Sequence, residues 1–266
     1  MDLPDGVQRI HADRRQPGAF EAALRDRRDD FDVFFDNTAF TPDDVSPMVE
    51  LFRDRLAHYV FTSSQAVYRR SFVLPIREDF ARHSPADDDP RKAYGVGKVR
   101  CEDLLLEVHE RTGFPATCLR VGHTMGPRSP APTRDPIFFA RLETGRPVLV
   151  PGDGFAVTQF VHINDVARCM TALMGNERVK GEAYNVSGRE VASILGVVHL
   201  VARAMGVNPE IVYVPQEIAR QATPIPTRGT RRKVGSTTPS TSVPKMPCLL
   251  DWMPAGRRER EATGKL

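Results

Sequence analysis

Long apolar runs are absent from the 266-residue chain. No stretch approaches the roughly 20 residues that a membrane-spanning helix needs, and the acidic first five residues lack the apolar core of a signal peptide. We therefore expect a cytoplasmic protein without membrane contacts. The hydrophobic fraction of 41% and the charged fraction of 27% are typical of a globular protein that buries a sizeable core.

Cysteine is scarce as well. The four cysteines, Cys101, Cys118, Cys169 and Cys248, form no CxxC pair, and none lies beside a histidine at metal-ligand spacing. We expect reduced thiols and no metal site.

The net charge of +3 is distributed unevenly. From Pro226 to the C-terminus the chain has nine Lys/Arg and three Asp/Glu, a net charge of +6, which leaves −3 for the remainder. From Thr223 onward, Pro, Ser, Thr and Arg dominate without a periodic apolar face, so we expect residues 223–266 to form a disordered tail. The tail is either a solvated segment or a contact for nucleic acid.

Strands and helices are predicted to alternate along the first 214 residues. Short apolar stretches predict strands, and apolar residues at a 3.6-residue period predict helices. Strands are expected at residues 6–10, 31–35, 58–61, 116–121 and 211–214. Helices are expected at residues 17–25, from Ser46-Pro47 onward, at 94–111, from a cap at Asn164 or Asp165 to 174, and at 194–205. This alternation predicts an α/β fold with a mainly parallel sheet covered on both faces.

Two short motifs contain side chains that could act in catalysis or ligand binding. Tyr94 and Lys98 are four residues apart, which on a helix places phenol and ammonium on one face, where the lysine stabilises a phenolate. Ser63 and Ser64 follow a predicted strand, at the end where parallel sheets bind ligands. Each motif alone also fits a plainer interpretation: an exposed tyrosine with a solvated lysine, and serines that hydrogen-bond within a turn.

Four segments in order, VFTSSQAVY, YGVGK, LRVGHTMGPR and FVHINDVAR, resemble the motif series of the NAD-dependent epimerase/dehydratase family. This family belongs to the extended short-chain dehydrogenase/reductase superfamily. The resemblance implies a Rossmann-like, doubly wound parallel sheet with a small C-terminal substrate lobe. It implies a truncated NAD(P)-binding domain at 1–150 and elements of the substrate lobe at 151–222.

The resemblance also assigns roles to residues. It implies a catalytic triad in which Tyr94 is the acid/base, Lys98 supports the phenolate and holds the nicotinamide ribose, and Ser64 orients the substrate hydroxyl. The cofactor would be NAD or NADP, with NAD preferred, and the substrate a sugar-like or other small carbinol bound by a homodimer. Besides Tyr94 and Lys98, the cofactor-binding residues would be Asp13, Arg14, Asn37, Thr38, Ala39, Ser63, Val121 and Gly122. The substrate-binding residues would be Ser64, Gln65, Ala66, His123 and Gln159.

The sequence departs from the family in three places. It contains no GxxGxxG phosphate-binding motif, and its first segment matches the family's third strand, so we expect an N-terminally truncated sheet. Thr158-Gln159 stands where nucleotide-sugar epimerases carry Arg-Asp, and His123 stands in place of a common asparagine. Both changes weaken the assignment of a nucleotide-diphosphate-sugar substrate. The Thr-Gln pair resembles a branch that includes chloroplast stem-loop RNA-binding proteins.

Three functional hypotheses follow. The chain is an NAD(P)-dependent oxidoreductase of the epimerase/dehydratase type, impaired or not by the missing glycine loop. Alternatively, it is a non-catalytic nucleotide- or RNA-binding protein of the same fold, with the basic tail as its contact. The third hypothesis is an inactive fragment that does not fold alone.

Overall fold

The computed structural model describes residues 5–71, 73–127, 135–216 and 218. They form two compact units, one from residues up to 127 together with Ala156–Ile194, the other from 135–155 and from Leu195 onward. None of the described helices is long and apolar enough to cross a membrane. The predicted tail at 223–266 lies outside the described residues.

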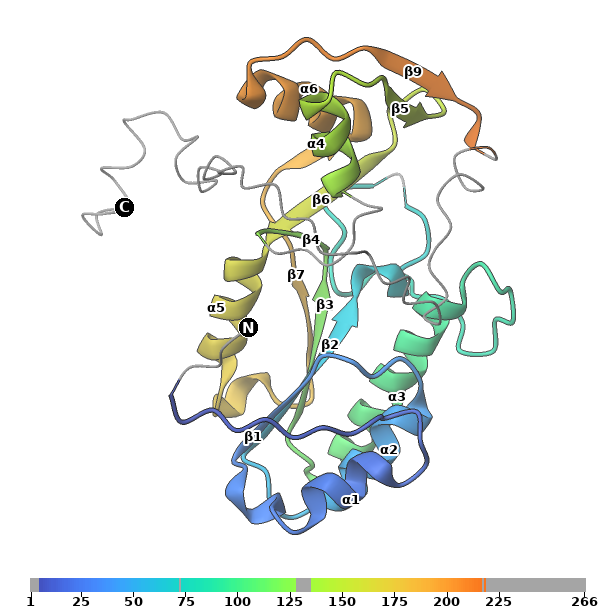
Figure 1. Ribbon diagram of the computed structural model, residues 1–266. Helices are drawn as coiled ribbons and strands as arrows, with labels where there is room; N and C mark the ends of the chain where they lie inside the picture. Colours follow the sequence, from blue (N-terminus) through green and yellow to red (C-terminus); the bar gives the residue numbers. More distant parts are fainter. Residues whose placement is uncertain (1–4, 72, 128–134, 217, 219–266) are drawn as a thin grey trace, which may run out of the picture. The chain divides into compact units, whose positions relative to one another are not determined.

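A four-stranded parallel sheet organises the first unit (Figure 1). Its strand order is β1 (Val33–Asp36), β2 (His58–Ser64), β3 (Ala116–Val121) and β7 (Ala183–Val186). All six residues of β3 are buried, as expected for a strand that is covered on both faces. The prediction of an α/β fold with a parallel sheet is therefore confirmed.

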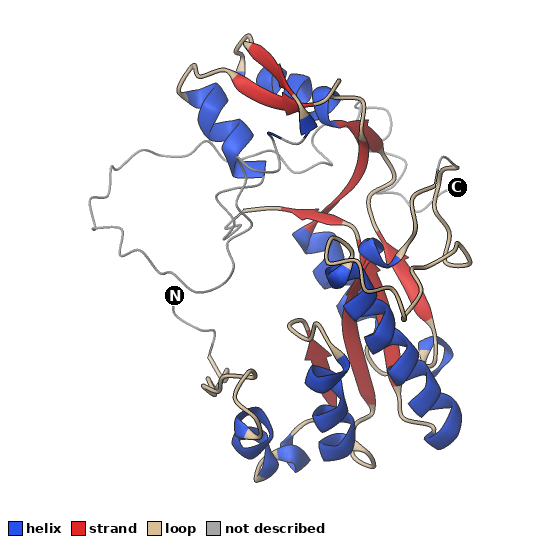
Figure 2. Ribbon diagram, turned by 90° about the vertical axis from the view of Figure 1, so that its right-hand side faces the viewer, coloured by secondary structure: helices blue, strands red, loops and turns tan. Residues whose placement is uncertain are grey.

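Helices cover both faces of this sheet, and Figure 2 shows helices lying along its strands. On one face, α1 (Ala19–Arg25), α2 (Pro42–Phe52) and α3 (Ala93–Thr112) pack against Tyr59 and Phe61 of β2. On the other face, α5 (Ile163–Leu173) packs against Val60. Successive residues of β2 thus point to opposite layers, because side chains alternate along a strand.

The remaining elements of the first unit are short. Strands β4 (His123–Met125), β6 (Val157–His162) and β8 (Val191–Ser193) form a small sheet in which β6 pairs parallel with β4 and antiparallel with β8. Three 3₁₀ turns complete the described part of the unit: η1 (Arg28–Asp30), η2 (Gln65–Val67) and η3 (Glu177–Val179).

The second unit contains α4 (Asp135–Glu143), β5 (Val148–Pro151), β9 (Ile211–Val214) and α6 (Ile194–Met205), whose first residue belongs to the other unit. Its strands β5 and β9 pair in parallel. The buried side chains of Val148, Val150, Val198 and Ala202 form its interior.

Several predicted boundaries agree with the structure, and three predictions were wrong. Residues 6–10 form no strand and are exposed, because no described strand lies beside them to accept their hydrogen bonds. Helix α2 begins at Pro42 and is capped by Thr41 rather than by Ser46, because Thr41 and Asp44 form a capping box five residues earlier. Helix α5 is capped by His162, whose Nδ1 accepts a hydrogen bond from the Asn164 amide at 3.2 Å.

Candidate functional site

The candidate site lies where β1 and β2 end and α3 begins. Ser64 is the last residue of β2 and caps η2, with its hydroxyl oxygen accepting a hydrogen bond from the Ala66 amide at 3.2 Å. Tyr94 and Lys98 lie in the first two turns of α3, which contacts η2. The structure therefore brings the three predicted catalytic residues onto adjoining elements of one unit.

Lys98 is buried, with 2% of its surface exposed. Its Nζ donates hydrogen bonds to the carbonyl oxygens of Ala39, at 2.7 Å, and Thr62, at 2.6 Å. The aromatic rings of Phe61 and Phe40 lie 4.7 Å and 5.0 Å from Nζ, so their π faces add favourable cation–π contacts. Burial lowers the pKa of Lys98, because removal from water disfavours the charged form.

Tyr94, in contrast, is open to solvent, with half of its surface exposed. Its ring centroid lies 6.0 Å from the Lys98 ammonium and 6.0 Å from the Phe40 ring. A cation beside an accessible phenol is an arrangement that suits proton exchange with a bound hydroxyl.

Two glycines allow α3 to approach the loops that hold these groups. A Cβ atom at Gly95 would lie 2.2 Å from the Ala66 carbonyl oxygen, and one at Gly97 would lie 2.4 Å from the Phe40 carbonyl oxygen. Neither glycine was among the predicted site residues. The available signal was their position inside a helix, where each costs about 1 kcal/mol relative to alanine and indicates a packing reason.

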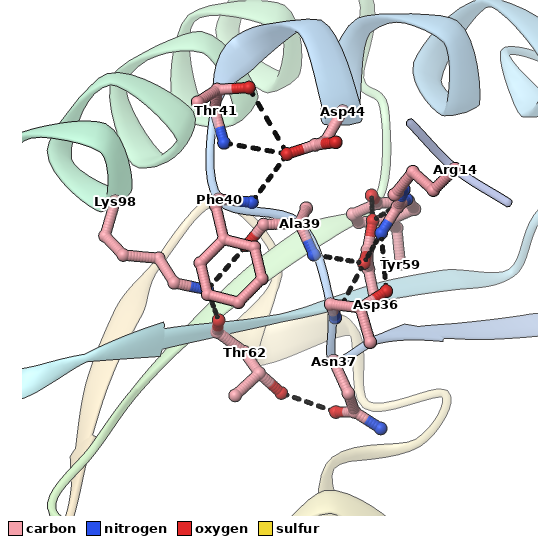
Figure 3. A network of polar contacts seen from close by, with 11 residues as sticks. Arg14, Asp36, Asn37, Ala39, Phe40, Thr41, Asp44, Tyr59, Thr62 and Lys98 are labelled. Carbon is pink, nitrogen blue, oxygen red and sulfur yellow. Dashed lines mark hydrogen bonds and ion pairs between the residues drawn. The ribbon is translucent and has the colours of Figure 1, made fainter. Parts of the chain in front are cut away.

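A buried carboxylate, also missed by the sequence analysis, fixes the loop after β1 (Figure 3). Asp36 is 2% exposed and pairs with both terminal nitrogens of Arg14, at 2.5 Å and 2.6 Å. It also accepts hydrogen bonds from the Tyr59 hydroxyl at 2.6 Å and from the amides of Thr38 and Ala39. Burial, reinforced by the Asp36 charge, raises the pKa of Tyr59 well above its ordinary value.

The predicted cofactor residues of this loop take part in the same network. Arg14 also donates to the Thr38 hydroxyl at 2.9 Å, and the Thr62 hydroxyl donates to the Asn37 side-chain oxygen at 2.6 Å. Asp13 is not connected to it through its carboxylate, which pairs with Arg15 at 3.1 Å. The structure thus joins Arg14 and Asn37 to the site.

Ser63 faces a different environment. It is 2% exposed, and its hydroxyl donates to Glu102 of α3 at 2.5 Å. Glu102 is fully buried and forms an ion pair with Arg120 of β3, whose nitrogen lies 2.9 Å from the carboxylate. A contact between Ser63 and a cofactor would therefore use the main chain.

The predicted substrate residues converge next to the end of β3. A Cβ atom at Gly122 would lie 3.2 Å from the Gln159 carbonyl oxygen, the Gln65 side-chain oxygen and a side-chain carbon of Ser187. Gln65 donates to the Ser187 hydroxyl at 3.0 Å, and the His123 ring packs edge-on against Phe160. Gly122 follows Val121, whose backbone pairs with Ser64 of β2, so this cluster adjoins the catalytic residues.

The residues present fit the nicotinamide-ribose end of a dinucleotide better than its phosphates. An ammonium has three N–H groups, and the two carbonyl oxygens around Lys98 take two of them, which leaves one for a ligand hydroxyl. Gly122 leaves main-chain room beside the polar side chains of Gln65 and Ser187. The chain as printed has no glycine-rich loop for a pyrophosphate.

Comparison with known proteins gives one family. The model of the NAD dependent epimerase/dehydratase family matches residues 27–187. Among curated proteins, the chloroplast stem-loop binding protein of 41 kDa b from Arabidopsis thaliana is 30% identical over 218 residues, 81% of this chain and 54% of that protein. An uncharacterized UDP-glucose epimerase of Bacillus subtilis is 33% identical over 121 residues, 44% of this chain and 37% of that protein. The chain thus spans about half of these relatives or less.

Solved structures show the same fold. The UDP-glucose 4-epimerase of Thermus thermophilus in complex with NAD superposes with a TM-score of 0.68 at 22% identity, covering 80% of this chain and 74% of that one. The dTDP-glucose 4,6-dehydratase of Bacillus anthracis in complex with NAD gives a TM-score of 0.64 at 18% identity, covering 76% of this chain and 68% of that one.

Proposed function

The chain belongs to the NAD-dependent epimerase/dehydratase family, and we propose that its site oxidises or epimerises a sugar-like carbinol with a nicotinamide cofactor. The observation that carries this proposal is the buried Lys98 ammonium 6.0 Å from the half-exposed Tyr94 ring. When bound, the nicotinamide supplies a hydride acceptor.

The residues of the chain would transfer the substrate proton and orient the substrate and the cofactor. Tyr94, as phenolate, accepts the proton of the substrate hydroxyl as its carbon loses a hydride, and returns it when the carbonyl is reduced. Lys98 stabilises the phenolate and donates to a ribose hydroxyl. Ser64 orients the substrate oxygen, and Gln65, Ala66, His123 and Gln159 border the substrate.

We propose NAD rather than NADP, with the main chain of Asn37, Thr38, Ala39 and Ser63 beside the cofactor, Val121 and Gly122 beside the nicotinamide, and Asp13 and Arg14 near the adenosine. Residues 1–150 would supply the dinucleotide site and residues 151–222 the substrate lobe. The NAD complexes of two structural neighbours support the choice of cofactor. We also propose that the protein acts as a cytoplasmic homodimer, which light scattering of the purified chain tests.

Calorimetric titration with NAD⁺ and NADP⁺ tests the assignment of Lys98. We expect NAD⁺ binding by the wild-type chain and at least about tenfold weaker binding by Lys98→Met, which corresponds to about 1.4 kcal/mol. The control is Lys92→Met, because Lys92 adjoins the same helix but pairs with Asp87 at 2.9 Å. Absence of binding by the wild type, or equal losses in both variants, would contradict the proposal.

A second candidate function is RNA binding. It is favoured by the 30% identity to a stem-loop binding protein and by the net charge of +6 from residue 226 onward. If the tail binds phosphates, affinity for a stem-loop RNA should fall steeply with salt and disappear when residues 226–266 are deleted. Equal binding by the shortened chain, or no binding by either, would remove this candidate.

A further inference from the structure

The peptide group between Ala39 and Phe40 lies between an ammonium and a carboxylate (Figure 3). Its carbonyl oxygen accepts the hydrogen bond from Lys98 Nζ at 2.7 Å. The N–H of the same peptide, on Phe40, donates to Asp44 Oδ2 at 2.8 Å. The two charges therefore act on opposite ends of one amide dipole, and hydrogen bonds in such a chain strengthen one another.

We propose that Asp44 is a positioning residue that holds the Ala39 carbonyl against Lys98 through this peptide and stabilises the charged form of the lysine. The inference rests on the proposed function in that Lys98 is the group it serves. Asp44 itself touches neither Lys98 nor a predicted ligand position in the described contacts, so it acts through the peptide.

Helix capping alone does not account for the contacts of Asp44. A capping box requires a bond from the Thr41 amide to the Asp44 side chain, and that bond is present at 3.0 Å. Asp44 Oδ2 also accepts from the Thr41 hydroxyl at 3.2 Å and, one residue beyond the box, from the Phe40 amide. The additional bond reaches the peptide that binds Lys98.

A second carboxylate holds the preceding peptide. Asp36 Oδ1 accepts from the Ala39 amide at 3.1 Å, so Ala39 is fixed on both sides of its carbonyl. The charge of Asp36 is compensated by Arg14, whereas no ion pair among the described residues includes Asp44. The negative charge of Asp44 can therefore polarise the Ala39–Phe40 peptide, which strengthens the hydrogen bond between the Ala39 carbonyl and Lys98.

Other groups around Lys98 also affect its charge. Burial lowers the pKa of Lys98, and the charge of Arg14 also lowers it. Cys101 on the same helix, Asp36 at the end of β1 and Asp44 on α2 raise it. The contribution of Asp44 must therefore be isolated by changing that residue alone.

The test is the titration of Lys98 in Asp44→Asn. Asparagine keeps the shape and a side-chain acceptor but removes the charge. The chain has six lysines, so ¹³Cε-labelled lysine gives few NMR signals, and the Lys98 signal is the one that Lys98→Met removes. We expect the Lys98 midpoint in Asp44→Asn to fall by about 0.5 to 1 pH unit relative to wild type.

The matched control is Asp43→Asn. Asp43 is exposed and lies in the same first turn of α2, so the change in net charge is identical. We expect less than about a third of the Asp44→Asn shift, because the Asp43 charge is screened by water. An unchanged midpoint in Asp44→Asn, or equal shifts in the two variants, would overturn the proposal.

Two precautions keep the outcome interpretable. If Asp44→Asn does not fold, Asp44→Ser is used in its place, because serine keeps a short acceptor for the helix cap. The Lys98 midpoint is again expected to fall. The titration requires no cofactor, so a failure of this inference is distinguishable from a failure of the proposed function, which would appear as absent NAD⁺ binding.

Discussion

The ion pair between Arg120 and Glu102 gives a prediction about stability. Replacement of Arg120 by Met keeps an apolar side chain of similar length but removes three contacts to Glu102, at 2.9 to 3.2 Å. Loss of one partner of a buried ion pair costs about 3–5 kcal/mol. Arg82 still reaches Glu102 at 3.0 Å, so we expect the lower end, about 3 kcal/mol. This is a large part of a typical stability of about 5–15 kcal/mol.

Thermal and urea unfolding measure the effect. A loss of about 3 kcal/mol should lower the melting temperature by about 6–12 °C for a domain of this size. Arg111→Met is the control, because the Arg111–Glu107 pair is exposed on the same helix as Glu102 and contributes about 0.3–0.5 kcal/mol at most.

The double variant Arg120→Met/Glu102→Met separates an unpaired charge from lost packing. It should be at least about 1 kcal/mol more stable than Arg120→Met, because no buried carboxylate is left without its partner. A cost for Arg120→Met below about 1 kcal/mol, or equal to that of Arg111→Met, would refute the reasoning.

Three further predictions follow from buried groups and close contacts. Burial lowers the pKa of His58 in the folded state. The stability that its neutral form contributes is therefore present above the unfolded pKa of about 6.5 and is lost as the pH falls below that value. His58→Gln should flatten the stability–pH curve below about pH 6.5. Burial raises the pKa of the Cys101 thiol to about 12 and that of Cys118 well above its usual range, so peptide mass spectrometry after alkylation at pH 8 should show both labelled far more slowly than the half-buried Cys169. Gly97→Ala places a methyl 2.4 Å from a loop carbonyl oxygen, so it should destabilise the chain by at least about 1 kcal/mol in urea unfolding, and a neutral result would show that the loop yields.

The sequence predicted those elements whose signals are local. Strand β3 and helix α6 have the predicted bounds, because an apolar run and a 3.6-residue period are properties of neighbouring residues. The start of α2 was wrong because Ser46-Pro47 and Thr41-Pro42 offer similar capping signals, and the hydrogen bonds of Asp44 decide between them.

The sequence predicted the chemical groups of the candidate site but not the buried contacts that hold its loops and strand ends in place. The Tyr94–Lys98 spacing is visible in the chain, whereas the pairing of Arg14 with Asp36 joins residues 22 positions apart. No periodicity indicates that Ser63 donates to Glu102, 39 residues later. Such contacts depend on which strand ends lie together, which only the folded sheet determines.

The acceptors of Lys98 are main-chain oxygens of residues 39 and 62. A carbonyl is retained whichever amino acid occupies its position, so point mutation cannot delete either acceptor directly. A substitution elsewhere can weaken these two hydrogen bonds only by displacing the backbone or by altering the side chains that hold the backbone in place. The site should therefore tolerate side-chain replacement at positions 39 and 62 as far as space allows. Mutation of Asp36 or Asp44 should instead disturb the contacts of Lys98, although neither residue belongs to a catalytic motif.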